Sequence, residues 1–350
     1  MRTETEIHPQ ASAKAGLGTG LAPARRDPST LIRRRGLASA AIARCLGLLA
    51  LFVSSTGAEA NPYQDYAAAC RAQIGEIPAF SCADGVTIPV TINGVEPAGY
   101  TPGMTCDRPS LLPNGPESDG QCVPGSRILD LSTEDKQISV MCRQKHIRPA
   151  DSLYFDEIDI IAHNPASGAT CWFQASAVSA SHIDGTTIPS PTDPASSTFF
   201  NAPQAVVHDG CGTCHDNDPF MYSPFVGQVW DHVPVNPFGL YFHVDTPGLG
   251  FDTWPTTHIA PRDSTCTGCH RIGVHETCGQ LTDWATARAL IPGADPRGAS
   301  YPLSHSMPPF HGLTERAWDT INTAAVDDIA ACCLDPTQTF CNAKPIPRGE

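Results

Sequence analysis

The sequence predicts an α+β fold in two parts: a disulfide-linked, β-rich part over residues 61–200 and a loop-rich, mainly α part over residues 201–350. Short runs in which apolar and polar residues alternate lie in the first part and are typical of strands. The clearest helical periodicity lies near the C-terminus. The chain also holds 33 Pro and 29 Gly among 350 residues, which favours short elements joined by loops and argues against a coiled coil or a helical repeat.

Composition narrows the class of protein further. Fifteen cysteines in one chain indicate an oxidising compartment, where disulfides persist. The net charge of −14 argues against nucleic-acid binding, because that activity needs a basic face.

Residues 1–60 have the order of a signal peptide. Basic residues, including Arg33–Arg35, precede the apolar run Leu46–Val53, and small residues lead to an A-x-A cleavage site at Ala58–Ala60. The apolar run is shorter than the roughly 20 residues that span a bilayer, so we expect a cleaved signal rather than an anchor. The three arginines leave the Sec and twin-arginine routes open. We therefore expect a mature chain that has no membrane span and is exported, to the periplasm rather than the medium.

Residues 61–200 carry the strand signals. We expect strands at Val86–Ile92, Gln137–Cys142, Asp156–Ala162 and Thr170–Gln174. Asn93-Gly94 predicts a hairpin turn, and Asn164–Gly168 predicts a second turn. The Pro- and Ser-rich run Ile188–Ser197 predicts a linker or long loop. No Ser/His/Asp set or carboxylate pair stands out, so the sequence assigns this part no chemistry.

Residues 201–350 predict two helices. The first is Gln280–Leu290, which Pro292-Gly293 would end. The second is Thr314–Cys333, where Thr314 can cap the N-terminus and Glu315 suits the positive end of the helix dipole. Its residues at steps of three and four form one apolar face, made of Trp318, Ile321, Ala325, Ile329 and Cys332.

Two copies of the motif Cys-x-x-Cys-His carry the chemistry. Two thiols three residues apart lie on one side of a helical turn, where both can add to the vinyl groups of one haem as thioethers. The histidine that follows then reaches the iron as an axial ligand. This spacing is the attachment signature of c-type haem. The candidate site residues are Cys211, Cys214 and His215 for one haem, and Cys266, Cys269 and His270 for a second.

Two other interpretations of the motifs are weaker. A zinc site shared by both Cys-x-x-Cys pairs would have 51 residues between Cys214 and Cys266, whereas compact zinc sites have roughly 15–20. Zinc also leaves the histidine after each pair unexplained. A redox disulfide of the Cys-x-x-Cys type normally begins a helix after a strand in a βαβ unit, and no such unit is visible.

The motifs and their surroundings resemble di-haem c-type cytochromes. The segments that carry the resemblance are Cys214–Phe220, Cys269–Gly273 and Ala331–Cys333, with the region around Met307. They are similar to a group of exported bacterial di-haem proteins in which a Cys-containing N-terminal domain precedes the haem domain. The resemblance implies that residues 201–350 form a di-haem cytochrome c-type domain.

The second haem has one preferred distal ligand. A low-spin haem that carries electrons has a second axial ligand, usually Met or His. Ser306–Phe310 holds Met-Pro-Pro before the C-terminal helix and is similar to the distal-ligand loop of single-haem cytochromes c. We expect Met307 to bind the second iron, because the prolines fix the backbone and leave little entropy to lose. His305 and His311, which flank this loop, are the alternatives, as is a core position for Met307.

The distal ligand of the first haem stays open. His208 and Met221 stand too close to the first motif in sequence to cross the ring, and a site without a protein ligand is a further alternative. The remaining candidates are His163, His182, His232, His243 and His258.

Ten cysteines remain in the mature chain after four are assigned to haem, an even number that predicts five disulfides. The adjacent pair Cys332 and Cys333 should bond outward, because a bond between neighbours is strained. Together with Cys278 and Cys341 they would form two disulfides. Proximity in sequence favours three more, Cys70–Cys82, Cys106–Cys122 and Cys142–Cys171.

We expect an exported di-haem c-type cytochrome that passes single electrons to and from a redox partner protein, whose docking face could be basic because this chain is acidic. One alternative is a haem redox enzyme of the di-haem peroxidase kind, in which one iron has an open or displaceable axial position. Another is a haem-based sensor or binding module, in which the β-rich part recognises a partner. No residue is assigned a catalytic role.

Overall fold

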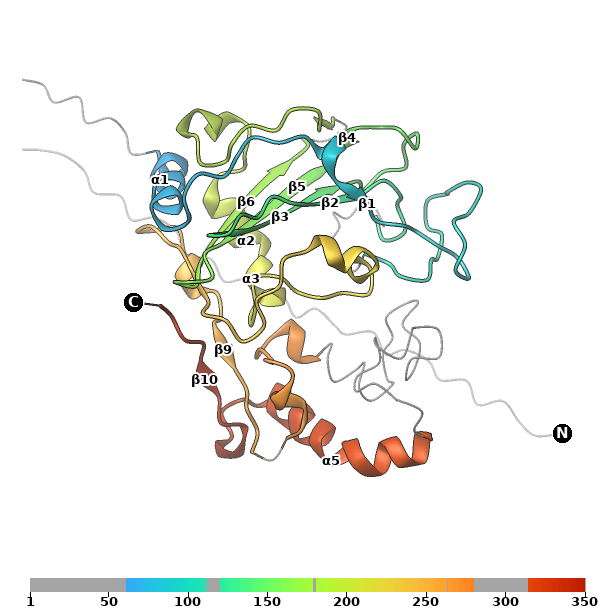
Figure 1. Cartoon of the computed structure of the whole chain (residues 1–350), viewed down its shortest axis with the longest axis vertical. Coiled ribbons are helices and arrows are strands. Elements are labelled where there is room, and N and C mark those ends of the chain that lie inside the picture. The colour runs from blue at the N-terminus through green and yellow to red at the C-terminus, as the bar shows by residue number, and fades with distance from the viewer. Residues whose placement is uncertain are drawn as a thin grey trace, which may run out of the picture. The chain divides into compact units, whose positions relative to one another are not determined.

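The computed structural model describes residues 61–110, 112, 120–178, 181–262, 264–279 and 314–349 (Figure 1). The expected signal peptide and the expected helix Gln280–Leu290 lie outside the described residues. So do Met307, His305 and His311. None of the described helices has both the length and the apolar character that crossing a bilayer requires.

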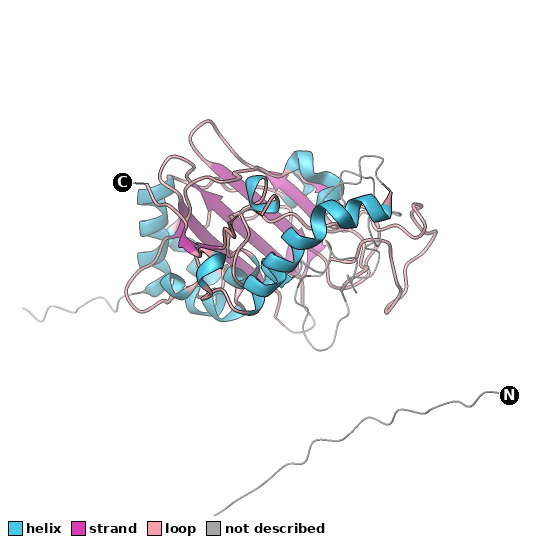
Figure 2. Cartoon of the chain, turned by 90° about the horizontal axis from the view of Figure 1, so that it is seen from below, coloured by secondary structure: helices cyan, strands magenta, loops and turns pink. Residues whose placement is uncertain are grey.

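A six-stranded sheet lies at the centre of the described structure (Figure 2). Its strand order is β1-β2-β3-β5-β6-β8, and neighbours are antiparallel except β6 and β8, which are parallel. The strands are β1 (Val86–Thr87), β2 (Arg127–Asp130), β3 (Gln137–Arg143), β5 (Glu157–His163), β6 (Ala169–Ser176) and β8 (Phe242–His243). Two short pairs lie outside the sheet, β4 (Tyr154–Phe155) with β7 (Ile183–Asp184), and β9 (Thr257–His258) with β10 (Lys344–Pro345).

Strands β3, β5 and β6 confirm three of the four expected strands. The expected strand Val86–Ile92 pairs with the sheet only over Val86–Thr87, because the chain then turns away and buries Ile88 in a second apolar cluster. The expected hairpin turn is confirmed. Asn93 (φ 52°) and Gly94 (φ 78°) both adopt left-handed backbone, and the N–H of Ile92 donates to the carbonyl of Val95 (2.9 Å).

Helix α1 (Pro62–Ile74) is absent from the sequence prediction, because its inward face uses Tyr, Ala and Cys in place of Leu or Val. The side chain of Asn61 caps the helix by accepting a hydrogen bond from the N–H of Tyr63 (3.1 Å), and Pro62 occupies the first turn. On the inward face, the hydroxyl of Tyr66 accepts a hydrogen bond from the N–H of Trp172 in β6 (2.9 Å). The helix therefore covers one face of the sheet.

The two faces of the sheet differ because side chains alternate along each strand. Along β3, Ile138, Val140 and Cys142 are buried in the core on the α1 side. Ser139, Met141 and Arg143 point to the opposite face and line a cavity there. The core on the α1 side also contains residues from beyond position 200, among them Val206, Tyr241 and Phe251.

The described residues after position 200 do not form a mainly α part, so that expectation is corrected. Only α5 (Glu315–Leu334) among them exceeds seven residues, and α2 (Pro203–Asp209) and α3 (Cys211–Cys214) are short. Loops rich in Pro and Gly connect these elements, because such residues end regular structure early. The 3₁₀ helices of the described chain are η1 (Cys82–Asp84), η2 (Pro194–Thr198), η3 (Val226–His232), η4 (Phe251–Thr253), η5 (Cys266–Gly268) and η8 (Thr339–Cys341).

The start of α5 agrees with the sequence prediction. Thr314 caps the helix, and its Oγ1 accepts a hydrogen bond from the N–H of Ala317 (3.2 Å). Of the expected apolar face, Ala325, Ile329 and Cys332 are buried, whereas Ile321 is 58% exposed. The side chain of Trp318 lies outside the described residues.

The run Ile188–Ser197 was expected to be a linker or a long loop. It is a loop only as far as Asp193, after which η2 begins, and it is bonded to the core. The backbone of Ile188 exchanges two hydrogen bonds with that of Phe80 (2.8 and 3.0 Å). The hydroxyl of Thr192 accepts a hydrogen bond from the N–H of Ile77 (3.1 Å). A loop tied at two points cannot act as a free hinge.

Five disulfides join ten of the fourteen described cysteines, as expected for a chain that folds in an oxidising compartment. Cys106–Cys122 is confirmed, and the neighbours Cys332 and Cys333 bond outward to Cys341 and Cys278. The expected bonds Cys70–Cys82 and Cys142–Cys171 are wrong. The observed bonds are Cys70–Cys171, from α1 to β6, and Cys82–Cys142, from η1 to β3. Proximity in sequence did not predict these two disulfides, because the fold of the sheet brings cysteines together that are distant in the chain.

Removing the long-range disulfide should cost more stability than removing the short-range one. Cys70 and Cys171 are 101 residues apart and Cys106 and Cys122 are 16 apart. Loop-closure entropy gives roughly 4.7 kcal/mol for a loop of about 100 residues and about 3 kcal/mol for one of about 15. We expect the double variant Cys70→Ala/Cys171→Ala to lose more free energy of unfolding in urea than Cys106→Ala/Cys122→Ala. Equal losses, or the reverse order, would contradict this account of the two bonds.

Candidate haem-attachment sites

The first Cys-x-x-Cys-His motif forms a single helical turn. Gly210 ends α2 with a left-handed backbone (φ 72°) that lets α3 begin at once. The N–H of His215 donates to the carbonyl of Cys211 (2.9 Å), which closes the turn. Cys211, Cys214 and His215 consequently line one cavity of about 440 Å³. This volume is in the range of cofactor sites.

The sheet forms the floor of this first cavity. The face opposite α1 supplies alternate residues from three strands: Ser139, Met141 and Arg143 of β3, Glu157, Asp159 and Ile161 of β5, and Trp172 and Gln174 of β6. Residues from the segment 220–233 close the cavity, including Phe220, Met221 and Val233. The first motif thus borders a cavity whose floor combines charged and polar side chains with Met141, Ile161 and Trp172.

The imidazole of His215 is buried and takes the neutral form that the side chain of a metal ligand needs. Its Nδ1 is buried and makes no hydrogen bond to any described residue, and its ring packs edge-on against Trp172 with the ring centroids 5.0 Å apart. Burial lowers the pKa of His215 to about 4. The imidazole is therefore neutral at pH 7, which is the form that binds a metal. The hydroxyl of Tyr241 donates to the carbonyl of His215 (2.6 Å) and holds the backbone in place.

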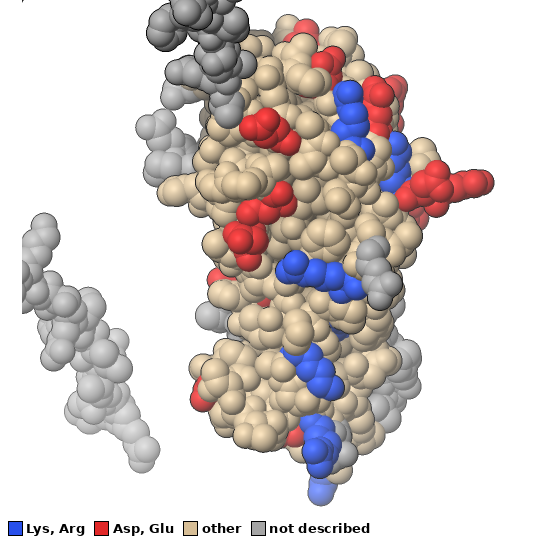
Figure 3. Space-filling view, turned by 90° about the vertical axis from the view of Figure 1, so that its left-hand side faces the viewer, with Lys and Arg blue, Asp and Glu red and all other residues tan. Residues whose placement is uncertain are grey.

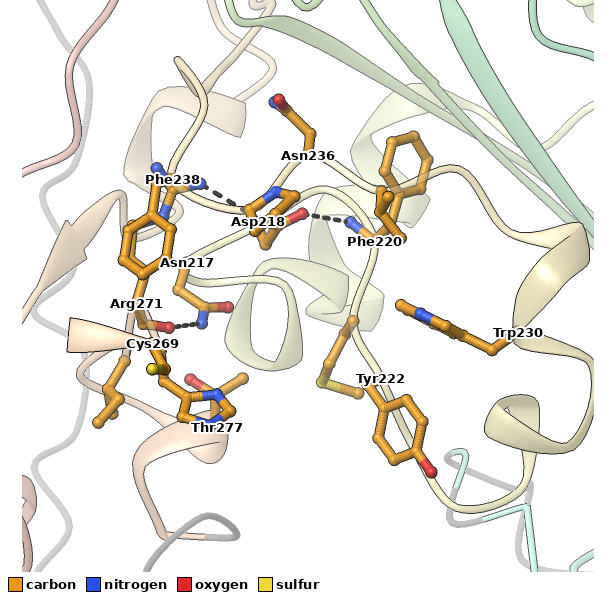
Figure 4. A pocket seen from close by; sticks show the side chains of 15 residues that line it. Asn217, Asp218, Phe220, Tyr222, Trp230, Asn236, Phe238, Cys269, Arg271 and Thr277 are labelled. Carbon is orange, nitrogen blue, oxygen red and sulfur yellow. Dashed lines mark hydrogen bonds and ion pairs between the residues drawn. The ribbon is translucent and has the colours of Figure 1, made fainter. Parts of the chain in front are cut away.

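The second motif repeats this local geometry. The N–H of His270 donates to the carbonyl of Cys266 at 2.9 Å, the same closure as in the first motif. Cys269 and His270 line a second cavity of about 400 Å³, whereas Cys266 packs against a separate apolar cluster. Burial lowers the pKa of His270 and favours its neutral form. Figure 4 shows Cys269 and Arg271 on one side of this cavity, with Tyr222 and Trp230 on the other.

The two cavities share a wall, since Phe220 and Met221 line both. The segments that directly follow the two histidines are also bonded together. Asp216 accepts hydrogen bonds from the N–H of His275 (2.6 Å) and the hydroxyl of Thr277. Asn217 donates to the carbonyl of Arg271 (Figure 4). The two attachment turns are therefore held beside each other.

The thiols of the motifs stay apart from the disulfides. All four, Cys211, Cys214, Cys266 and Cys269, remain free while the other described cysteines are paired. Cys211 and Cys214 line the first cavity, whereas only Cys269 of the second pair lines the second cavity, and no three His, Cys, Asp or Glu side chains among the described residues converge on one metal position. The shared zinc site weighed above therefore finds no support in the described chain. Free thiols beside neutral histidines fit the attachment of haem.

A charged group lies at one end of the first cavity and is absent from the sequence prediction. Arg143, which is 2% exposed, and Lys145 both pair with Glu157 (3.0 and 2.7 Å). Asp159 lies beside them, and burial together with the charge of Glu157 raises the pKa of Asp159 well above its usual value. Two cations, Arg143 and Lys145, thus lie in the wall of the first cavity beside the carboxyl groups of Glu157 and Asp159. Cations in such a place can pair with the carboxylate groups of a ligand.

Within the described structure, none of the histidines considered for the first haem lines either cavity. His163 uses both ring nitrogens, one with Thr170 (2.8 Å) and one with Asn236 (2.7 Å). Nδ1 of His243 accepts a hydrogen bond from the indole N–H of Trp172 (3.0 Å). The others lie outside both walls: exposed His182 and His208, half-buried His258, and His232, which is near Asp231 (3.7 Å).

Two methionines line the first cavity in place of a second histidine. Met221 does so although it stands close to the motif in sequence. Met141 was missed altogether. The alternation along β3 could have identified Met141. Its neighbours Val140 and Cys142 point into the core, so the side chain of Met141 points to the opposite face of the sheet.

Gly212 allows the attachment turn to pack closely. A methyl group at this position would overlap the indole ring of Trp254, whereas one at Gly268 in the second motif would meet no atom within 4 Å. We expect Gly212→Ala to lower the free energy of unfolding by about 1–3 kcal/mol, as overpacking does in cores. Gly268→Ala is the matched control and should have little effect. Urea unfolding of both variants measures the difference, and equal stabilities would contradict the described contact.

No known family matches the chain, and no curated protein or solved structure is significantly similar to it.

Proposed function

We propose that the chain is a di-haem c-type cytochrome that transfers single electrons. The observation that carries this proposal is that each Cys-x-x-Cys-His motif borders its own cavity and that the two cavities share the wall formed by Phe220 and Met221. When bound, haem supplies one-electron chemistry at its iron. The residues of the chain would hold each haem, supply its axial ligands and balance its charge.

The residues of the motifs have distinct roles. Cys211 and Cys214 would hold one haem by thioether bonds, and Cys266 and Cys269 would hold the other. His215 and His270 would donate their neutral rings to the iron atoms. Arg143 and Lys145 would balance carboxylate charge at the first site. Met307 is proposed as the distal ligand at the second.

The arrangement of the two sites favours transfer within one chain. Phe220 and Met221 line both cavities, and the hydrogen bonds to Asp216 and from Asn217 fix the two turns relative to each other. A fixed, short separation suits electron transfer because no motion of the protein is needed between donor and acceptor.

The surface charge supports a basic redox partner. The net charge is −14, and Figure 3 shows a face on which acidic side chains gather in the upper part, with basic side chains beside them at the right and along the lower part. A partner with a basic docking face would be steered to the acidic region by long-range attraction. Such steering weakens as the salt concentration rises.

The charged group at the first cavity favours one second candidate, a haem redox enzyme of the di-haem peroxidase kind. Asp159 is a buried carboxyl group in the wall of the cavity, where it could hold or release a proton. Such an enzyme requires an iron with an open or displaceable axial position. Ferric spin state separates the candidates: two low-spin haems that ignore peroxide exclude the enzyme, and one high-spin haem that binds peroxide quickly excludes a simple carrier.

Haem content tests the main proposal directly. We expect the matured chain to carry two haems that survive denaturing electrophoresis, because thioether bonds are covalent. The variants Cys211→Ala/Cys214→Ala and Cys266→Ala/Cys269→Ala should each keep one. Intact mass and haem absorbance per chain measure the number. A chain matured with the haem-attachment machinery that shows no added mass would refute the proposal.

A further inference from the structure

We propose that Met141, in the central part of the sheet, is the distal axial ligand of the first haem. This inference rests on the proposed function and names the residue that would complete the first iron site. It replaces the set of histidines that the sequence left open.

The composition of the cavity wall supports this assignment. Among the described residues that line the first cavity, His215 is the only histidine. Methionine is the other usual distal ligand of a low-spin haem, and the wall contains Met141 and Met221. The choice for the first iron therefore lies between two thioethers.

The position of Met141 favours it over Met221. Met141 lies in β3, which is hydrogen-bonded to β2 on one side and β5 on the other, and it stands opposite Ile128 and Asp159 in the register. A backbone bonded on both sides fixes the position of its Cα atom and the direction in which its side chain leaves the strand. The bond between iron and a thioether is weak, so a ligand held in advance loses less entropy when it binds. Met221 lies in a loop segment and borders the second cavity as well.

Met141 and His215 also lie on different walls, as two axial ligands of one iron must. His215 packs against Trp172 of β6, whereas Met141 projects from β3, and β5 lies between these strands. Because β5 lies between them, β3 and β6 are separated by two strand spacings, or about 9–10 Å. The neighbours of Met141 on the same face, Ser139 and Arg143, line the cavity too, so the thioether stands in the middle of the floor. Its partial exposure within the sheet is to this cavity.

The test uses the full-length, haem-loaded protein in a Met307→Leu background, which removes the other expected methionine ligand. Leucine is close to methionine in volume, so the fold should be kept. In this background we expect the sulfur–iron charge-transfer band of one ferric haem and one strongly upfield methionine methyl signal in the reduced protein. Met141→Leu should abolish both and convert the first haem to high spin. Met221→Leu is the matched control and should leave both signals unchanged.

A second substitution separates ligation from packing. Met141→His should restore a low-spin first haem and lower its reduction potential relative to the methionine form, because bis-histidine ligation favours the ferric state. Retention of the band in Met141→Leu, its loss in Met221→Leu, or its absence from the Met307→Leu background would each overturn the assignment. In all these variants the haem content should stay at two, so a failed ligand assignment is distinguishable from a failed function.

Discussion

The alternation of side chains along β3, β5 and β6 is the constraint on which the rest of the structure depends. One set of residues, such as Ile138 and Ile158, is buried beneath α1 and forms the core. The intervening set, such as Met141 and Asp159, forms the floor of the first cavity. A shift of the register by one residue would exchange the two sets and destroy the core and the site together. Stability and the proposed chemistry are thus specified by the same strands.

The second constraint is the bonding between the two attachment turns. Each turn is only a few residues long and could not hold its shape alone, because a short helix is marginal in water. The first turn packs against Trp172 of the sheet and against Trp254, which follows η4, and the second turn is bonded to the first through Asp216 and Asn217. These contacts explain how a part with little regular structure can still place two motifs beside each other.

The sequence was informative wherever the signal was local. The strands β3, β5 and β6, the Asn93-Gly94 turn, the cap at Thr314 and the two motifs all depend on residues close together in the chain. The sequence did not predict contacts between segments that are far apart in the chain. Cys70 and Cys171 are joined only because α1 packs on β6, and Met141 enters the site only because of the face on which β3 presents it. Helix α1 was missed since its buried residues Tyr66 and Ala67 give a weak apolar pattern.

The outward bonds of Cys332 and Cys333 have a consequence for the second site. The Cys278–Cys333 disulfide closes a covalent ring whose two ends are 55 residues apart in sequence, and Met307 is a member of that ring. The ring begins only eight residues after His270. In the proposed di-haem protein, this covalent ring would limit how far the Met307 thioether can move from the second iron, and would so raise its effective concentration there. A weak bond between sulfur and iron would then re-form quickly after it breaks.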